Sequence, residues 1–308
     1  MIKKPVICFG ELIIDFVAGE KGKSLAEVRL FRKNPGGAPA NVAVGLHFHH
    51  IPVLLWSKVG KDSFGQFLKA QIKEIGLPVD GISEDPLHPT KLAFVGIRED
   101  GDRYFEFHNL NSAEQYIKPA DLDMKQLENA SVFHFGGVAL LGEVTARTTF
   151  QLLPIARKSG CLVSFDPNIR LDLCKNSRQV LARIQQVIRF VDILKMSREE
   201  YEMVFSGTAP LEILSQGVSL LVITEGAQGC RLVTRKFDVR VASQPVEAID
   251  TTGAGDAFTA AMLAFLLKNP RWCLSSLSER RLREIAEFAN RWAGKIVQHQ
   301  GAISAYLK

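Results

Sequence analysis

The chain carries the sequence Asp250-Thr251-Thr252-Gly253-Ala254-Gly255-Asp256-Ala257-Phe258, in which two glycines precede a carboxylate and a run of small and apolar residues. The run over 257–267 has good helix potential, so the glycines should form a turn that leads into a helix. The first N–H groups of a helix lack partners within it and lie at the positive end of its dipole. The stretch therefore predicts a pocket for an anion such as phosphate, with Asp256 in the first helical turn.

A carboxylate beside a phosphate pocket can accept the proton of an attacking hydroxyl group. Asp256 is thus a candidate general base, and Gly253, Ala254 and Gly255 are candidates for an anion hole. The alternative interpretation is that Asp256 only caps the helix and the glycines only turn the chain. For Gly253-Ala254-Gly255-Asp256 taken alone the alternative is the better one. The two threonines, Asp250 and a second stretch of the chain favour the functional interpretation.

The second stretch is Asn34-Pro35-Gly36-Gly37-Ala38-Pro39-Ala40-Asn41. The two glycines let another group approach the backbone closely, and proline is accepted in the first turn of a helix. Asn41 would then lie near the helix start, where its amide can exchange hydrogen bonds with a sugar hydroxyl. A purely structural hydrogen bond from Asn41 is equally compatible with the sequence.

The rest of the chain alternates strands and helices from about residue 132, which indicates a parallel sheet with helices on both faces. Across the whole chain, strands are predicted over 6–9, 53–56, 132–135, 162–165, 193–195, 220–223 and 239–242. Helices are predicted over 38–48, 64–75, 144–158, 179–190, 199–205, 256–267 and 279–297. Segments 92–97 and 104–107 flank Glu99-Asp100-Gly101-Asp102, a hairpin signal without an intervening helix. The chain should therefore form one α/β domain with a small additional set of β-hairpins.

Composition limits the classes of function. The 308 residues are 46% hydrophobic and carry a formal net charge of +5, and the basic residues are spread along the chain, so no nucleic-acid partner is predicted. No apolar run reaches the length of a membrane span, so no membrane partner is predicted either. The five cysteines form no CxxC pair, which favours reduced thiols and a cytoplasmic protein; they are Cys8, Cys161, Cys174, Cys230 and Cys273.

Together the two stretches resemble the signatures of the ribokinase family of carbohydrate kinases, also called the phosphofructokinase-B type, at 36–45 and 250–263. The resemblance runs through nearly the whole chain. It implies a ribokinase-like three-layer α/β sandwich with a mainly parallel central sheet and a small β-sheet lid. It also implies a single kinase domain over 1–308, whose lid comes from segments near 12–35 and 92–110 and pairs two chains into a homodimer.

The resemblance also assigns roles to individual residues. It makes Asp256 the catalytic base and Gly253, Ala254 and Gly255 the anion hole, and it implies ATP and Mg²⁺ as cofactors. The sugar would be bound by Asp15, Gly37, Asn41, Arg103 and Arg170, and the nucleotide by Thr224, Gly226, Gly229, Asn290 and Ala293. Glu200 would hold Mg²⁺ through water, with Ser197 in place of the usual Asn. Asp250 and Thr252 would bind a monovalent cation such as K⁺.

Several features narrow the choice of reaction and substrate. Neither GxGxxG nor GxxxxGK[ST] occurs, which argues against a Rossmann dehydrogenase and a P-loop kinase.

The segments 10–16, 37–41 and 103–105 look most like bacterial fructokinases, although Glu114 stands where these have Asp. The rival substrate is 2-keto-3-deoxygluconate, whose kinases share Asp166-Pro167-Asn168-Ile169-Arg170. Arg170 could bind that acid or simply pair with Asp166 or Asp172. Two further alternatives remain open: a kinase of another small sugar or nucleoside, and a catalytically silent regulator that binds a nucleotide or a sugar.

Overall fold

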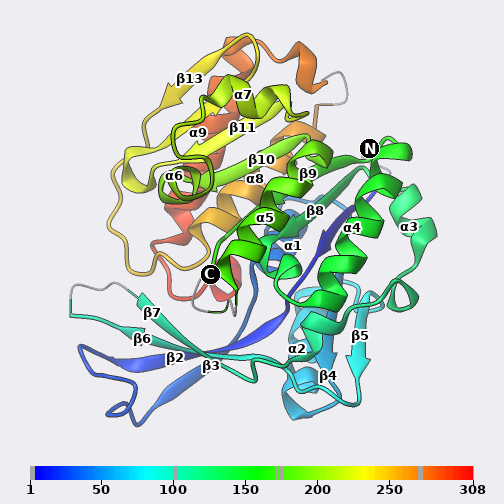
Figure 1. The fold of residues 1–308 in the computed structure, drawn as a ribbon. Helices are drawn as coiled ribbons and strands as arrows, with labels where there is room; N and C mark the ends of the chain where they lie inside the picture. Colours follow the sequence, from blue (N-terminus) through cyan, green and yellow to red (C-terminus); the bar gives the residue numbers. More distant parts are fainter. Residues whose placement is uncertain (1–3, 100–102, 171–172, 174–175, 270–272, 308) are drawn as a thin grey trace.

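The computed structural model describes residues 4–99, 103–170, 173, 176–269 and 273–307. Its centre is a nine-stranded sheet in the order β13-β12-β11-β10-β9-β8-β1-β4-β5 (Figure 1). All neighbours pair in parallel except β12, which is antiparallel to both of its neighbours. The strands are β1 (Val6–Phe9), β4 (Val53–Gly60), β5 (Ile82–Asp85), β8 (Val132–Gly136), β9 (Leu162–Asp166), β10 (Ile193–Ser197), β11 (Leu220–Thr224), β12 (Cys230–Val233) and β13 (Asp238–Val241).

Helices cover both faces of this sheet and make three layers. Successive side chains of a strand point to opposite faces, and β1 shows this directly. Val6 and Cys8 belong to one hydrophobic core, whereas Ile7 and Phe9 belong to the other. The first core holds residues of α1 (Ala38–Phe48), α2 (Ser63–Ile75), α8 (Ala254–Leu267) and α9 (Glu279–Ile296). The second holds residues of α3 (Met124–Glu128), α4 (Glu143–Lys158), α5 (Ser177–Val187), α6 (Arg198–Phe205) and α7 (Pro210–Ser215).

A second sheet of four strands lies below the central one in Figure 1, in the order β3-β2-β6-β7. Its strands are β2 (Ile13–Lys21), β3 (Phe31–Gly36), β6 (Leu92–Ile97) and β7 (Arg103–His108). The predicted hairpin is therefore present as β6 and β7, although its Asp-Gly turn at 100–102 lies outside the described residues, as does Cys174. The two antiparallel pairs are joined by a parallel pairing of β2 with β6, which no local sequence signal indicates.

The predicted helices and strands are all present, most within two residues of their predicted ends. Four elements were missed: β5, which has the polar sequence ISED; β12, which follows β11 after a five-residue loop; and the short helices α3 and α7, which have five and six residues. Strands β2 and β3 were expected only as lid segments within 12–35. Segment 188–190, predicted as part of a helix, forms a separate 3₁₀ turn after α5. Among the described helices, none combines the length and apolarity needed to cross a membrane.

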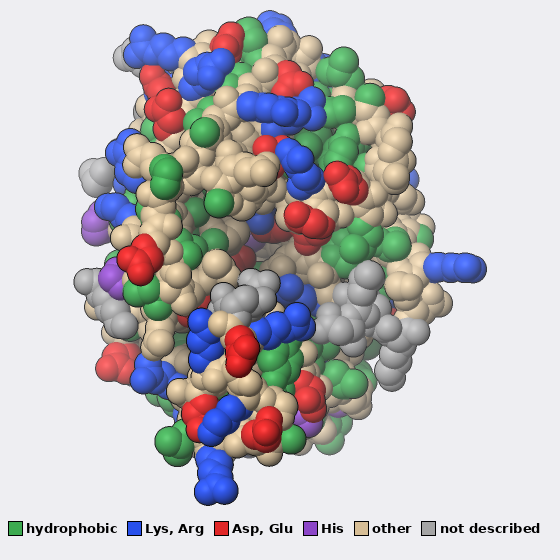
Figure 2. All heavy atoms as spheres, turned by 90° about the vertical axis from the view of Figure 1, so that its left-hand side faces the viewer, with side chains coloured by type: hydrophobic (Ala, Val, Ile, Leu, Met, Phe, Trp, Pro, Cys, Tyr) green, Lys and Arg blue, Asp and Glu red, His purple; other side chains and the backbone are tan. Residues whose placement is uncertain are grey.

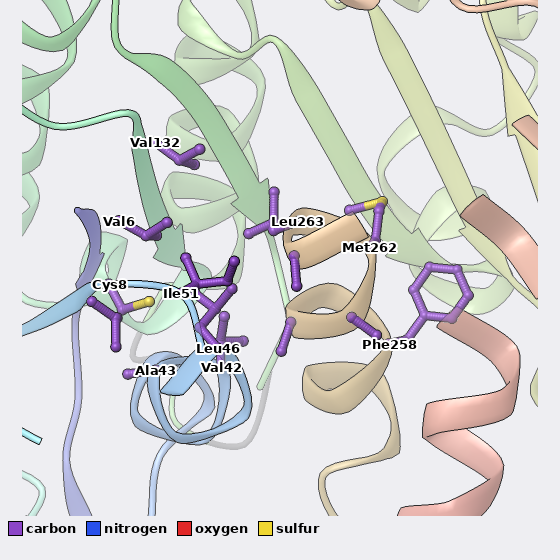
Figure 3. Close-up of a cluster of buried hydrophobic side chains, with 14 of the residues drawn as sticks. Val6, Cys8, Val42, Ala43, Leu46, Ile51, Val132, Phe258, Met262 and Leu263 are labelled. Carbon is purple, nitrogen blue, oxygen red and sulfur yellow. The ribbon is translucent and has the colours of Figure 1, made fainter. Parts of the chain in front are cut away.

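Helices α1 and α8 pack against each other on one face of the sheet, with Val42 and Leu46 of α1 near Leu263 of α8 (Figure 3). Gly45 permits this packing. A Cβ added at Gly45 would lie 2.6 Å from the Ala260 Cβ and 2.6 Å from the Tyr306 hydroxyl oxygen. The two helices can therefore approach closely enough to bring their N-termini together.

This packing predicts that Gly45→Ala destabilises the protein although alanine favours helices. We expect a loss of about 1–3 kcal/mol in the free energy of unfolding, the usual cost of overpacking a core. Gly294→Ala in α9 is the matched control, because its Cβ would meet Val246 only at 3.7 Å. The control should be neutral or more stable by up to about 1 kcal/mol. Urea denaturation of both variants checks this, and equal effects would contradict it.

Candidate active site

A cleft of about 480 Å³ is lined by residues of both sheets and of the N-termini of α1 and α8. Figure 2 shows a face of the molecule that is hollowed near its centre, with acidic and basic side chains around the hollow. The residues predicted for the sugar and the anion hole all line this cleft: Asp15, Gly37, Asn41, Arg103, Arg170, Gly253, Ala254, Gly255 and Asp256. The structure thus brings together groups that are up to 241 residues apart in the chain, from Asp15 to Asp256.

Asp256 lies in the first turn of α8, as predicted. The helix begins at Ala254 after Gly253, whose φ of 78° is a left-handed conformation that glycine adopts without strain. The Asn41 side-chain amide donates a hydrogen bond to Oδ2 of Asp256 at 2.7 Å. Burial raises the pKa of Asp256 to about 6, although the hydrogen bond from Asn41 opposes the rise. The carboxylate is therefore a stronger base than an ordinary Asp and is positioned by the N-terminal turn of α1.

Lys195 and Asp166 form a buried ion pair in the same cleft, with Nζ 2.7 Å from Oδ2. A Cβ added at Gly255 would lie 2.8 Å from this Nζ, so the ammonium group lies directly beside the α8 N-terminus. Burial opposes the charge of Lys195, but Asp166 and other carboxylates raise its pKa overall. Sequence reasoning missed Lys195. The available signal was that Lys195 and Asp166 both lie at the carboxyl ends of predicted neighbouring strands.

Arg103 and Phe105 of β7, both in the cleft lining, connect the four-stranded sheet to the larger body. The Arg103 guanidinium on β7 lies 2.5 Å from Oδ2 of Asp250, and the Arg170 guanidinium lies 5.3 Å from the centre of the Phe105 ring. Asp250 also accepts hydrogen bonds from the backbone N–H groups of Thr252 at 2.9 Å and Gly301 at 2.5 Å. These contacts balance the charge of Asp250 without an added cation, so the cation site at Asp250 and Thr252 stays a prediction.

Lys91, which also lines the cleft, belongs to a further buried ion pair. Nζ of Lys91 lies 2.9 Å from Oε1 of Glu114, and each side chain is 3% exposed. The Ser112 hydroxyl donates to the same Oε1 at 2.8 Å. Glu114, the residue that departs from the fructokinase pattern, is thus neutralised by a lysine of the cleft that sequence reasoning did not single out.

A second cavity of about 500 Å³ lies on the other side of the α8 N-terminus. All five residues predicted for the nucleotide line it, namely Thr224, Gly226, Gly229, Asn290 and Ala293. Its apolar lining includes Val246, Phe258 and Val297, and the Asn290 amide donates to the carbonyl of Val241 at 3.3 Å. The two cavities share Thr251, Ala254 and Gly255, so they meet where the helix presents its N–H groups.

Glu200 does not line either cavity. Its Oε1 accepts from the backbone of Ile169 at 2.6 Å and its Oε2 from that of Ser197 at 2.8 Å, so it caps α6 and supports the loop after β9. Asp166 does line the cleft, and its Oδ1 is buried without a hydrogen-bond partner in the described part of the chain. Within that part, no group of three or more His, Cys, Asp or Glu side chains could hold a metal ion by itself.

Comparisons with known proteins agree with this geometry. The chain is 38% identical to probable fructokinase-6, chloroplastic, from Arabidopsis thaliana, over 97% of this chain and 79% of the relative. The structure of a fructokinase with bound ATP from Xylella fastidiosa has a TM-score of 0.89 and 30% identity, and covers 98% of this chain and 95% of that one. A fructokinase double mutant from Vibrio cholerae, bound to fructose, ADP and a potassium ion, has a TM-score of 0.85 and 26% identity, with 98% and 95% covered.

The family itself is identified over nearly the full length. Residues 3–308 match the family described as pfkB family carbohydrate kinase. The match includes both stretches that form the cleft and the strands that position them. The chain therefore belongs to the pfkB family of carbohydrate kinases.

Proposed function

We propose that this protein is an ATP-dependent fructokinase, which transfers the γ-phosphoryl group of ATP to a hydroxyl of D-fructose. The observation that carries the proposal is the meeting of two cavities at the N-terminus of α8, beside Asp256. One cavity is polar and fits a sugar, and the other has an apolar wall that fits an adenine ring. The shared backbone N–H groups lie where a phosphoryl group would pass between them.

In the proposed reaction, Asp256 accepts the proton of the attacking hydroxyl group while Asn41 holds the carboxylate in place. The N–H groups of Gly253, Ala254 and Gly255 stabilise the charge on the transferred group, and the Lys195 ammonium beside Gly255 adds positive charge. Mg²⁺ held by the ATP phosphates supplies further positive charge. Asp166 lines the cleft and its Oδ1 lacks a hydrogen-bond partner among the described residues, whereas both oxygens of Glu200 accept backbone hydrogen bonds. Asp166 is therefore a better partner than Glu200 for a water molecule bound to Mg²⁺.

The charges of the cleft favour a neutral sugar over a keto acid. Lys91, Arg103 and Lys195 each already have a carboxylate partner. Conversely, three buried carboxylate oxygens of cleft residues lack hydrogen-bond donors from the described residues: Oδ1 of Asp15, Oε2 of Glu11 and Oδ1 of Asp166. A substrate rich in hydroxyl groups supplies such donors, whereas an added carboxylate would meet further negative charge. The fructokinase names of the relatives support the same choice.

The remaining assignments belong to the proposal as well. The four-stranded sheet would act as a lid of a single kinase domain over 1–308, with Arg103 and Phe105 facing the sugar. Leu30, 73% exposed beside β3, and Leu110, 52% exposed after β7, support a homodimer formed through this lid. The dimer and a cytoplasmic location stay predictions.

The role of Asp256 predicts that Asp256→Asn lowers kcat by at least about 100-fold, the low end of general-base effects. Binding of ATP should survive, because the amide keeps the size of the side chain. Asp123→Asn, the same change at the N-cap of α3, is the control and should leave kcat unchanged. Steady-state kinetics and nucleotide titration of the folded variants check this. Near-normal turnover by Asp256→Asn would show that Asp256 is not the general base.

The raised pKa values predict that activity is lost as the pH falls through neutrality. Burial raises the pKa of Asp256 to about 6 and that of Asp15 to about 7. Asp256 must be ionised to accept a proton, and Asp15 is the stronger hydrogen-bond acceptor when it is ionised. The active forms therefore exist above these pKa values and disappear below them. We expect kcat/KM for fructose to fall by at least about 10-fold between pH 7 and pH 5. A profile that stays flat down to pH 5 at saturating ATP and Mg²⁺ would contradict the prediction.

The charge balance predicts a preference for fructose over 2-keto-3-deoxygluconate in kcat/KM. Parallel measurements with both substrates, and with a panel of other sugars and nucleosides, check this. A clear preference for the acid that is lost in Arg170→Ala would overturn the fructokinase assignment and keep the sugar-kinase assignment. Sugar binding without ADP release from any substrate would instead favour a catalytically silent regulator.

A further inference from the structure

Glu11 lies in the connection between β1 and β2, where the chain passes from the central sheet to the four-stranded one. It is 5% exposed and lines the sugar cleft. Its Oε1 accepts a hydrogen bond from the backbone N–H of Ala38, the first residue of α1, at 2.9 Å. Its Oε2 is buried and has no hydrogen-bond partner within the residues that the structure describes.

A buried carboxylate oxygen without a donor is costly, since it has lost its hydration and gained nothing in return. Capping α1 requires only one acceptor oxygen, and Oε1 already serves that purpose. The side chain therefore carries more acceptor capacity than the fold uses. Burial raises the pKa of Glu11 to about 7. This rise is consistent with a carboxylate that has too few hydrogen-bond donors to replace its lost hydration.

Glu11 and Asp15 have different charged neighbours. The charges of Asp256 and Glu114 both raise the pKa of Glu11, so it lies within reach of the base and of the Lys91–Glu114 pair. Asp15 instead interacts most strongly with Arg103 and Arg170. Glu11 and Asp15 both line the cleft, and the charge of Asp256 raises the pKa of each.

We propose that Glu11 is a specificity-determining residue, which accepts a hydrogen bond from a sugar hydroxyl other than the one that is phosphorylated. The inference rests on the proposed function and deepens it. A site built to accept from a hydroxyl rejects analogues that lack it, because the acceptor is then left buried and unpaired. Glu11 would in this way select a polyhydroxylated sugar with a hydroxyl at one fixed position.

The test is Glu11→Gln, which keeps a carbonyl oxygen for the N–H of Ala38 but replaces the other oxygen by an NH₂ group that cannot accept. We expect kcat/KM for fructose to fall by about 10- to 100-fold, the usual range for a hydrogen bond to a charged group. The loss should appear mainly in KM for fructose, with KM for ATP and the melting temperature little changed. Glu106→Gln on β7 is the matched control, since Glu106 is exposed and does not line the cleft.

Monodeoxy analogues of fructose distinguish recognition from support of the helix. For the unmodified protein, one analogue should show a low kcat/KM, and with that analogue the penalty of Glu11→Gln should disappear because the bonded hydroxyl is absent. An equal penalty with every analogue, or no penalty with fructose, would overturn the inference and leave Glu11 as a cap of α1. Failure of the unmodified protein to phosphorylate fructose would instead refute the proposed function.

Discussion

The hydrogen bond of 2.7 Å between Asn41 and Asp256 is the interaction on which the site depends. It joins the first turns of two helices that lie more than 200 residues apart in the chain. Gly45 permits the close approach of α1 to α8, because a Cβ at this position would lie 2.6 Å from that of Ala260. The packing of these helices therefore sets the geometry of the buried pair of Asn41 and Asp256. We expect a methyl group added at Gly45 to disturb both the helix packing and this hydrogen bond.

Much of the fold and part of the site could be predicted because their signals are local. The turn at Gly253 and the acidic first turn of α8 are encoded within nine consecutive residues, and alternating strands and helices reveal the parallel sheet. The pairing of β2 with β6 and the ion pair of Lys195 with Asp166 depend on segments brought together only by the finished fold. Glu200 was assigned by resemblance, and the structure uses both of its oxygens for backbone hydrogen bonds.

The cleft shows a consistent division of charge. Its ion pairs are made within the protein, so carboxylates hold Lys91 and Lys195 in fixed positions before a substrate binds. What remains are acceptor oxygens and the N-terminus of a helix. Acceptors suit hydroxyl groups and a helix N-terminus suits phosphate, which are the two kinds of group that a sugar kinase must hold side by side.

The bond between Arg103 and Asp250 has a consequence for how this protein could acquire a new substrate. Asp250 directly precedes the turn that leads into α8, and it also accepts a hydrogen bond from the backbone N–H of Gly301. Replacing strand β7 by that of a relative would remove Arg103 from its contact with Asp250 unless the relative also has an arginine there. Such an exchange would therefore alter both the cleft lining and the turn that leads into α8. If the proposed sites are right, substrate range and phosphoryl transfer are linked through Arg103 and Asp250. We therefore expect mutations of β7 that widen the substrate range to require further changes that restore the turn before α8.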